Sequence, residues 1–133
     1  MPNQEQFNLL TDFSGIDGWN AWRDANPSAV IDLSGVSLAG VDLTGANLSN
    51  ANLSGADLNH AQMSEVNLSG ANLSRATLMH TNLFRANLHN TNLQNATLLR
   101  TNLTSLVDKT GVDLRGARAN EILGAMVLDG KLL

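Results

Sequence analysis

Cysteine and tyrosine are absent from this chain of 133 residues, and aromatic residues are few. Without cysteine the protein can form neither a disulfide nor a thiolate metal site, so its fold does not depend on the redox state of its compartment. No run approaches 18 apolar residues, and the first residues lack the basic start and apolar stretch of a signal peptide. The sequence therefore predicts a cytoplasmic protein with no membrane partner.

The net charge of -4 is unevenly distributed along the chain. Residues 1–30 contain Glu5, Asp12, Asp17 and Asp24 against Arg23. Residues 31–105 contain four acidic and three basic side chains, the acidic ones first and the basic ones later. Because no continuous basic surface results, we expect no nucleic-acid partner.

A unit of five residues repeats fifteen times without an insertion from Ile31 to Ser105. Each unit centres on a leucine, replaced once by Met63, and a small or β-branched residue precedes it by two positions. A period of five fits neither a helix nor a flat strand. An unbroken short repeat is typical of a solenoid, because one unit cannot bury its leucine alone. We expect a coil that turns a corner at every unit, with both apolar positions facing inward.

The units ANLSG, ANLSR and ADLNH resemble the pentapeptide-repeat family, whose motif is roughly A(D/N)LXX. The resemblance implies an all-β solenoid, a right-handed quadrilateral parallel β-helix with four units per coil and about four coils in this chain. It also implies relatives that mimic DNA and bind DNA gyrase, protecting it from quinolones or inhibiting it. Many other members have no assigned biochemical role.

Residues 1–30 predict an N-terminal helical cap. A cap is needed because a solenoid exposes unpaired strand edges and a core layer at each end. Four of the five aromatic residues lie in this segment. Two short helices are indicated by apolar residues at helical spacing, the first by Phe7, Leu10 and Phe13 and the second by Ile16, Trp19 and Trp22. Pro27 ends the second helix.

The repeat loses its register after Leu103. Asp108 stands where a leucine belongs, and Leu114 is one residue out of phase. Residues 106–133 therefore predict an irregular last unit and a short amphipathic helix, whose apolar face comprises Ala119, Ile122, Leu123 and Met126. This segment either caps the last coil or joins two subunits, so we expect a monomer or a homodimer through the C-terminal end.

No motif for catalysis is present, and we expect no enzyme, no cofactor and no metal. The serines lie in no nucleophile elbow, and no glycine-rich phosphate loop opens a helix. His60 and His80 should lie one coil apart, but with Asp57 alone nearby they supply too few ligands for a metal. We interpret them as solvated surface histidines.

A reading in columns of 20 residues places several unusual side chains on the polar outer surface. Met79 lies beside Leu99, Phe84 lies around a corner, and Glu65 is positioned for an ion pair with Arg85. The sequence predicts a non-enzymatic structural or protein-interaction module with an unknown protein partner. Its candidate partner-binding surface comprises Met79, Phe84, Leu99, Arg85, Arg100, His60 and His80. The alternative is a gyrase-binding DNA mimic, against which the basic second half of the repeat counts.

Overall fold

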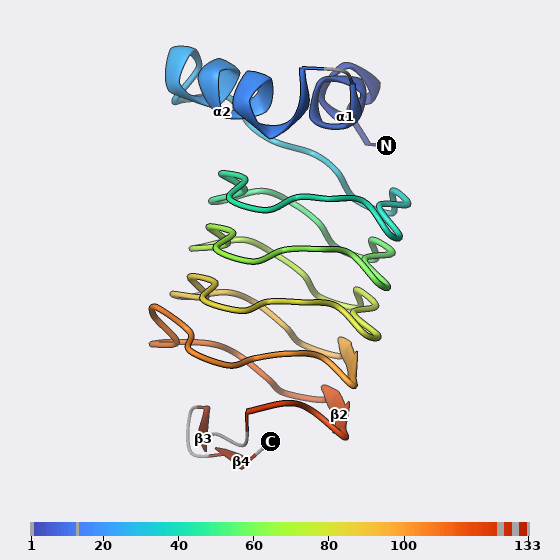
Figure 1. Cartoon of the computed structure of the whole chain (residues 1–133). Helices are drawn as coiled ribbons and strands as arrows, with labels where there is room; N and C mark the ends of the chain where they lie inside the picture. The colour runs from blue at the N-terminus through green and yellow to red at the C-terminus, as the bar shows by residue number, and fades with distance from the viewer. Residues whose placement is uncertain (1, 13, 125–126, 129–130, 133) are drawn as a thin grey trace.

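The computed structural model describes residues 2–12, 14–124, 127–128 and 131–132. Two helices, α1 (Gln4–Thr11) and α2 (Gly15–Ala25), lie at one end of a rod of stacked coils (Figure 1). The regular strands are short, and they are β1 (Thr97–Leu99), β2 (Arg118–Asn120), β3 (Val127–Leu128) and β4 (Lys131–Leu132). β1 pairs with β2 in parallel, and β3 pairs with β4 in antiparallel orientation.

Single parallel bridges, one on each of four faces, join the first four coils to one another. Asp32 pairs with Asn52, and Ser37, Asp42 and Asn47 pair in the same way with the residues 20 positions further on. Between coils, the Leu33 amide donates to the Asn52 carbonyl at 2.8 Å, and the Asn52 amide donates to the Ile31 carbonyl at 2.9 Å. The backbone is therefore satisfied by neighbouring coils, as in a parallel sheet.

Each corner is a tight turn that begins at the inward leucine. The Val36 amide donates to the Leu33 carbonyl at 3.4 Å, and Gly35 at the third position has a φ of 67°. Such a turn favours glycine at its third residue. His60 and Arg85 nevertheless occupy this position with φ of 62° and 58°, so their long side chains are held at the outer corners of the coil.

Where Asn or Asp precedes the leucine, its side chain stabilises the turn that follows. The Asp32 carboxylate accepts the Ser34 amide at 3.0 Å and the Ser34 hydroxyl at 2.7 Å, and the Asn47 amide oxygen accepts the Ser49 amide at 3.2 Å. This local bond replaces a backbone partner that the chain lacks at a corner. It explains the preference for Asn and Asp at this position.

The stacked leucines and the small residues two positions earlier form one continuous core. Leu48, Leu68 and Met63 are fully buried, and each buried leucine contributes up to about 2 kcal/mol. Buried threonines replace alanine at three inward positions and donate to carbonyls of the preceding coil, at 2.7 Å from Thr81 to Leu58, 2.8 Å from Thr91 to Leu68 and 2.6 Å from Thr101 to Leu78. The predicted inward positions are thus confirmed.

The two helices expected near the N-terminus are present, although Phe13, expected in the first, lies outside the described residues. They pair with the first coil through side-chain amides. Gln6 donates to the Val30 carbonyl at 2.8 Å and accepts the Asp32 amide at 2.9 Å. Asn20 donates to the Gly45 carbonyl at 3.0 Å and accepts the Asn47 amide at 2.8 Å. Each amide therefore takes the place of a neighbouring strand at the open edge of the coil.

Aromatic and basic side chains of α2 complete this junction. Trp19 is fully buried and its indole N–H donates to the Asn47 carbonyl at 2.8 Å. The Arg23 guanidinium donates to the Ser49 carbonyl at 2.8 Å, and burial lowers the pKa of Arg23. Together with Gln6, these groups cover two of the four faces of the first coil.

The predicted C-terminal helix is wrong for the residues that the structure describes, because the coil continues. Ala119 lies in β2 opposite Leu98, and Leu123 forms a parallel bridge with Asn102. Ala119 stands at the register position of the inward leucine but is exposed at this end of the rod. The repeat is therefore hidden in the sequence, and the helical spacing arises by coincidence. Met126 lies outside the described residues.

A β-bulge explains the loss of register. The amide of Val107 donates to the Ala86 carbonyl at 3.0 Å, while the carbonyl of Asp108 accepts the Leu88 amide at 2.8 Å. Two residues therefore face Asn87 on the preceding coil, and one extra residue is accommodated. With Asp113, Arg118 and Leu123 the bridges reach a fifth layer on three faces, where the sequence predicted about four coils.

Candidate functional site

Met79 and Leu99, predicted as neighbours, lie at a hollow on one corner of the rod. The hollow has a volume of about 290 Å³ and is lined by Met79, His80, Leu99, Arg100, Asn120 and Glu121. The Met79 and Leu99 side chains are half-buried and supply its apolar surface. We call these six residues the Met79 hollow.

Three successive coils build the Met79 hollow, and backbone bonds fix their spacing. The His80 amide donates to the Leu99 carbonyl, and the Arg100 amide donates to the Asn120 carbonyl, both at 2.9 Å. The Met79 amide donates to the side-chain oxygen of Asn59 at 2.8 Å. Because each layer is held by its neighbours, the side chains start from positions that do not have to be organised on binding.

The histidines stack as the period of 20 predicted. The rings of His60 and His80 lie 4.8 Å apart between centroids and are tilted by 8°. Both residues are exposed, and only His80 lines the Met79 hollow. The pair extends the edge of the hollow with a flat ring surface along the rod.

Arg100 makes an ion pair with Glu121 across the last two coils. Both side chains are more than half exposed, at 60% and 57%, so the pair contributes about 1 kcal/mol or less. Its effect on the site is to neutralise the guanidinium at the rim. The described lining of the Met79 hollow is therefore nearly neutral, and Met79 and Leu99 form its apolar part.

Phe84 and Arg85 do not join the Met79 hollow. They lie at the next corner, where Phe84 is 37% exposed and its amide donates to the side-chain oxygen of Asn82 at 3.0 Å. The ion pair expected between Glu65 and Arg85 is wrong, because the structure places no oxygen–nitrogen pair of these two described residues within 4.0 Å. The candidate surface is thus divided between two corners.

Sequence reasoning missed Asn120 and Glu121, which belong to the fifth layer. The unit "VDLRG" at 112–116 carried the signal, because it places Asp113 and Leu114 in the repeat pattern shifted by one residue. Counting 20 residues on from Leu99 and Arg100 with that shift leads to Asn120 and Glu121.

The described residues contain no cluster of three or more His, Asp or Glu side chains that could hold a metal ion. His89 has Asp108 as its acidic neighbour, at 3.4 Å between Nδ1 and Oδ2. In the described part of the chain, neither α1 nor α2 has the length and apolar composition needed to cross a bilayer.

The repeat matches a known protein family. The family model for pentapeptide repeats matches eight copies over residues 31–70, 61–98 and 81–106. These matches cover more than half of the chain. No curated protein is a significant match.

Solved structures of pentapeptide repeat proteins are similar to parts of the chain. Rfr23 of the cyanobacterium Cyanothece 51142 is 38% identical over 62% of this chain and 63% of its own, with a TM-score of 0.37. HetL of the cyanobacterium Nostoc sp. strain PCC 7120, involved in heterocyst differentiation regulation, is 30% identical over 76% and 59%, with a TM-score of 0.30. QnrB1, a plasmid-mediated fluoroquinolone resistance protein, is 20% identical over 59% and 58%, with a TM-score of 0.32.

The chain spans about three fifths of the length of Rfr23 and HetL. The matched repeats coincide with the coils whose bridges recur every 20 residues. On the strength of these repeats, this chain belongs to the pentapeptide-repeat family.

Proposed function

We propose that the chain is a non-enzymatic interaction module that binds a partner protein at the Met79 hollow. The partner contributes an apolar side chain, which packs against Met79 and Leu99. The observation that carries this proposal is the hollow itself, because two apolar side chains from successive coils line it together. Apolar anchors that fill such hollows dominate many protein interfaces.

The paired charges at the rim of the Met79 hollow favour an apolar side chain from the partner over a charged one. Arg100 is already paired with Glu121, so a carboxylate from a partner would have to compete with an existing acid. His80 and its stacked neighbour His60 offer ring faces and polar edges instead. An interface of this kind has an apolar centre and a polar rim.

The fixed backbone of the site favours binding without rearrangement. Amides on both sides of the hollow are bonded to the next coil, so little conformational entropy is lost when a partner docks. The repeat thus acts as a rigid support on which a few outward residues are varied.

Quantitative affinity capture from the cells that produce the protein tests the proposal. The bait is compared with the Met79→Ser/Leu99→Ser variant, and Phe84→Ser serves as the matched control at the next corner. We expect a set of proteins that is retained by the parent and by Phe84→Ser but lost from the double variant. Identical sets for all three baits would contradict the proposal.

DNA mimicry with binding to DNA gyrase is the second candidate, and the charge of the N-terminal half favours it. Residues 1–65 contain eight acidic side chains, and their single basic side chain, Arg23, is buried and bonded to Ser49. The later part of the chain is basic, with seven basic and four acidic residues in 66–133. A supercoiling assay separates the candidates: inhibition or quinolone protection at micromolar protein supports mimicry, whereas unchanged gyrase activity excludes it.

A further inference from the structure

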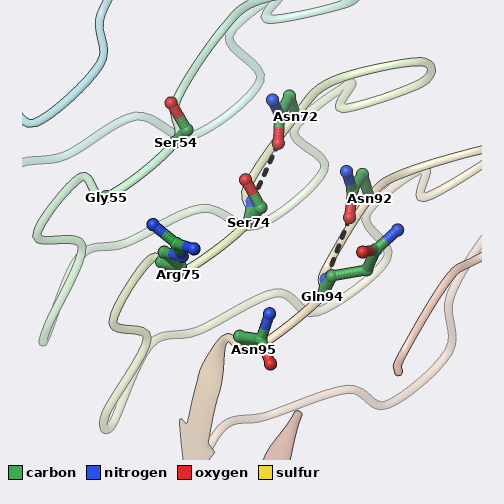
Figure 2. Close-up of a pocket in the computed structure, with 8 residues that line it drawn as sticks. All are labelled: Ser54, Gly55, Asn72, Ser74, Arg75, Asn92, Gln94 and Asn95. Carbon is green, nitrogen blue, oxygen red and sulfur yellow. Dashed lines mark hydrogen bonds between the residues drawn. The ribbon is translucent and has the colours of Figure 1, made fainter. Parts of the chain in front are cut away.

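A second hollow lies at a neighbouring corner of the rod (Figure 2). Its volume is about 480 Å³, and it is lined by Ser54, Gly55, Asn72, Ser74, Arg75, Asn92, Gln94 and Asn95. We call it the Arg75 hollow. Its lining contains hydroxyl, amide and guanidinium groups and no carboxylate, which distinguishes it from the apolar Met79 hollow.

The residues at one corner of successive coils leave the space for this hollow. Gly55, Arg75, Asn95 and Gly116 follow one another on successive coils at the left-handed turn position. Gly55 has no side chain beside Arg75, and a β-carbon built on it would meet nothing within 4 Å. The side-chain oxygen of Asn95 lies 2.1 Å from where a β-carbon of Gly116 would be. Asn95 therefore directs its oxygen away, toward the last coil.

Hydrogen bonds within the turns orient the other amides. The Asn72 oxygen accepts the Ser74 amide, and the Asn92 oxygen accepts the Gln94 amide, both at 2.9 Å (Figure 2). With their oxygens occupied, these side chains have their Nδ2 groups available as donors. Gln94 in turn donates through Nε2 to Asp113 at 2.7 Å.

Arg75 is the charged group of this hollow. Within the described chain its guanidinium makes no hydrogen bond or ion pair, whereas Arg23, Arg100 and Arg115 bond to Ser49, Glu121 and Asp113. Asp113, the acid beside the hollow, is occupied by Arg115 at 2.6 Å. An unpaired guanidinium thus lines the same hollow as several amide donors.

We propose that the Arg75 hollow binds an oxyanion, a carboxylate or a phosphate group. Arg75 provides the charge and a planar pair of donors, which matches the geometry of either group. Asn72, Asn92 and Asn95 provide further N–H donors on two coils. The site is separate from the Met79 hollow, so the two proposals can fail independently.

Solution NMR with the intact protein tests this site directly. Side-chain NH₂ signals of Asn72, Asn92 and Asn95 and the Nε–H signal of Arg75 are followed while sodium phosphate or sodium acetate replaces sodium chloride at constant ionic strength. We expect saturable shifts at these four residues in the millimolar range, because the site is open to solvent and screening by salt is strong. Saturation with one anion or with both identifies the group that binds.

Two asparagine variants provide the control, because Asn95 shows that asparagine adopts this turn position with a φ of 59°. Arg75→Asn should weaken the binding at least tenfold and leave the unfolding midpoint close to that of the parent. Arg85→Asn, which removes an exposed arginine from another corner, should leave the binding unchanged. Linear shifts without saturation, or equal titrations for the parent and Arg75→Asn, would overturn the proposal.

Discussion

The side-chain oxygen of Asn50 lies 2.2 Å from the position that a β-carbon on Gly70 would occupy one coil further on. The same relationship recurs at Asn90 and Gly111, at 2.0 Å. Asparagine and glycine thus alternate along this corner, the amide of one coil filling the space left by the glycine of the next.

The Asn50 contact predicts that two glycines with the same backbone differ in their tolerance of alanine. Gly70 and Gly55 have φ of 69° and 67°, but a β-carbon on Gly55 would meet nothing within 4 Å. Alanine in this left-handed region costs about 1 to 2 kcal/mol at either site. Urea unfolding should show a larger loss for Gly70→Ala, and adding Asn50→Gly, which removes the side chain and suits the left-handed φ of 58° at that position, should reduce that loss to about the Gly55→Ala value. Equal losses in the two single variants would show that the contact is not significant.

The indole bond between α2 and the first coil predicts unequal effects for the two tryptophans. Trp19→Phe leaves the partly buried Asn47 carbonyl without its donor, and we expect a loss of about 1 to 2 kcal/mol in the free energy of unfolding. Trp22→Phe is the matched control, because Trp22 is half-buried and packs against Trp19 with ring centroids 5.5 Å apart and ring planes tilted by 32°. Denaturant unfolding monitored by circular dichroism measures both. A Trp19→Phe variant as stable as Trp22→Phe would argue against closure of the coil by this bond.

The inward and outward positions of one unit predict opposite results for the same new charge. Leu68 is fully buried, so Leu68→Asp places an unpaired carboxylate in the core and should cost more than about 3 kcal/mol. Asn67→Asp introduces the residue found at the equivalent Asp32 and Asp42 and should preserve the bond to the Ser69 amide, which is 3.0 Å long. Thermal unfolding compares them, and a folded, soluble Leu68→Asp protein would refute the assignment of the core.

The aspartates of the first coil predict a loss of stability in acid. Bonds from the Ser34 hydroxyl and amide lower the pKa of Asp32, and those from Thr44 lower the pKa of Asp42. A lowered pKa in the folded state means that the stabilisation is present at neutral pH and is lost as the pH falls below about 4 through the folded-state pKa.

Replacing Asp32 and Asp42 with asparagine should reduce this acid sensitivity. Asparagine retains the side-chain oxygen that accepts the turn amide, as at Asn47 and Asn67, but does not titrate. The Asp32→Asn/Asp42→Asn variant should match the parent in stability at pH 7 and lose less between pH 4 and pH 2, measured by urea unfolding across that range. If both proteins lose stability in parallel, these carboxylates do not contribute to acid unfolding.

Much of the rod could be predicted because the sequence period directly determines which residues pack in the core. A leucine every fifth residue has to be buried in the same direction each time, so the inward positions, the stacked His60 and His80 and the adjacent Met79 and Leu99 follow by counting. Counting fails at Val107, where a single extra residue is absorbed by a bulge that depends on backbone bonding with Ala86. A simple count of 20 therefore does not predict the fifth layer, nor the residues Asn120 and Glu121 that this layer adds to the site.

The sequence also did not predict the hydrogen bonds that side chains make within the turns. The period shows that Asn47 and Asn67 lie beside the core, but not that each side chain holds the next turn amide. Likewise, a shared column places Glu65 and Arg85 near each other, while solvated side chains gain too little from pairing for the sequence to determine their geometry. Side-chain orientation at the corners therefore had to come from the structure.

The central claim is that Met79 and Leu99 form a binding surface for a protein partner, and the dissociation constant measured with a recovered partner tests it most directly. Removing two apolar contacts from the centre of an interface should cost about 2 kcal/mol or more, a weakening of about thirtyfold or greater for Met79→Ser/Leu99→Ser. Phe84→Ser should bind like the parent. Equal dissociation constants for the parent and the double variant would contradict the account.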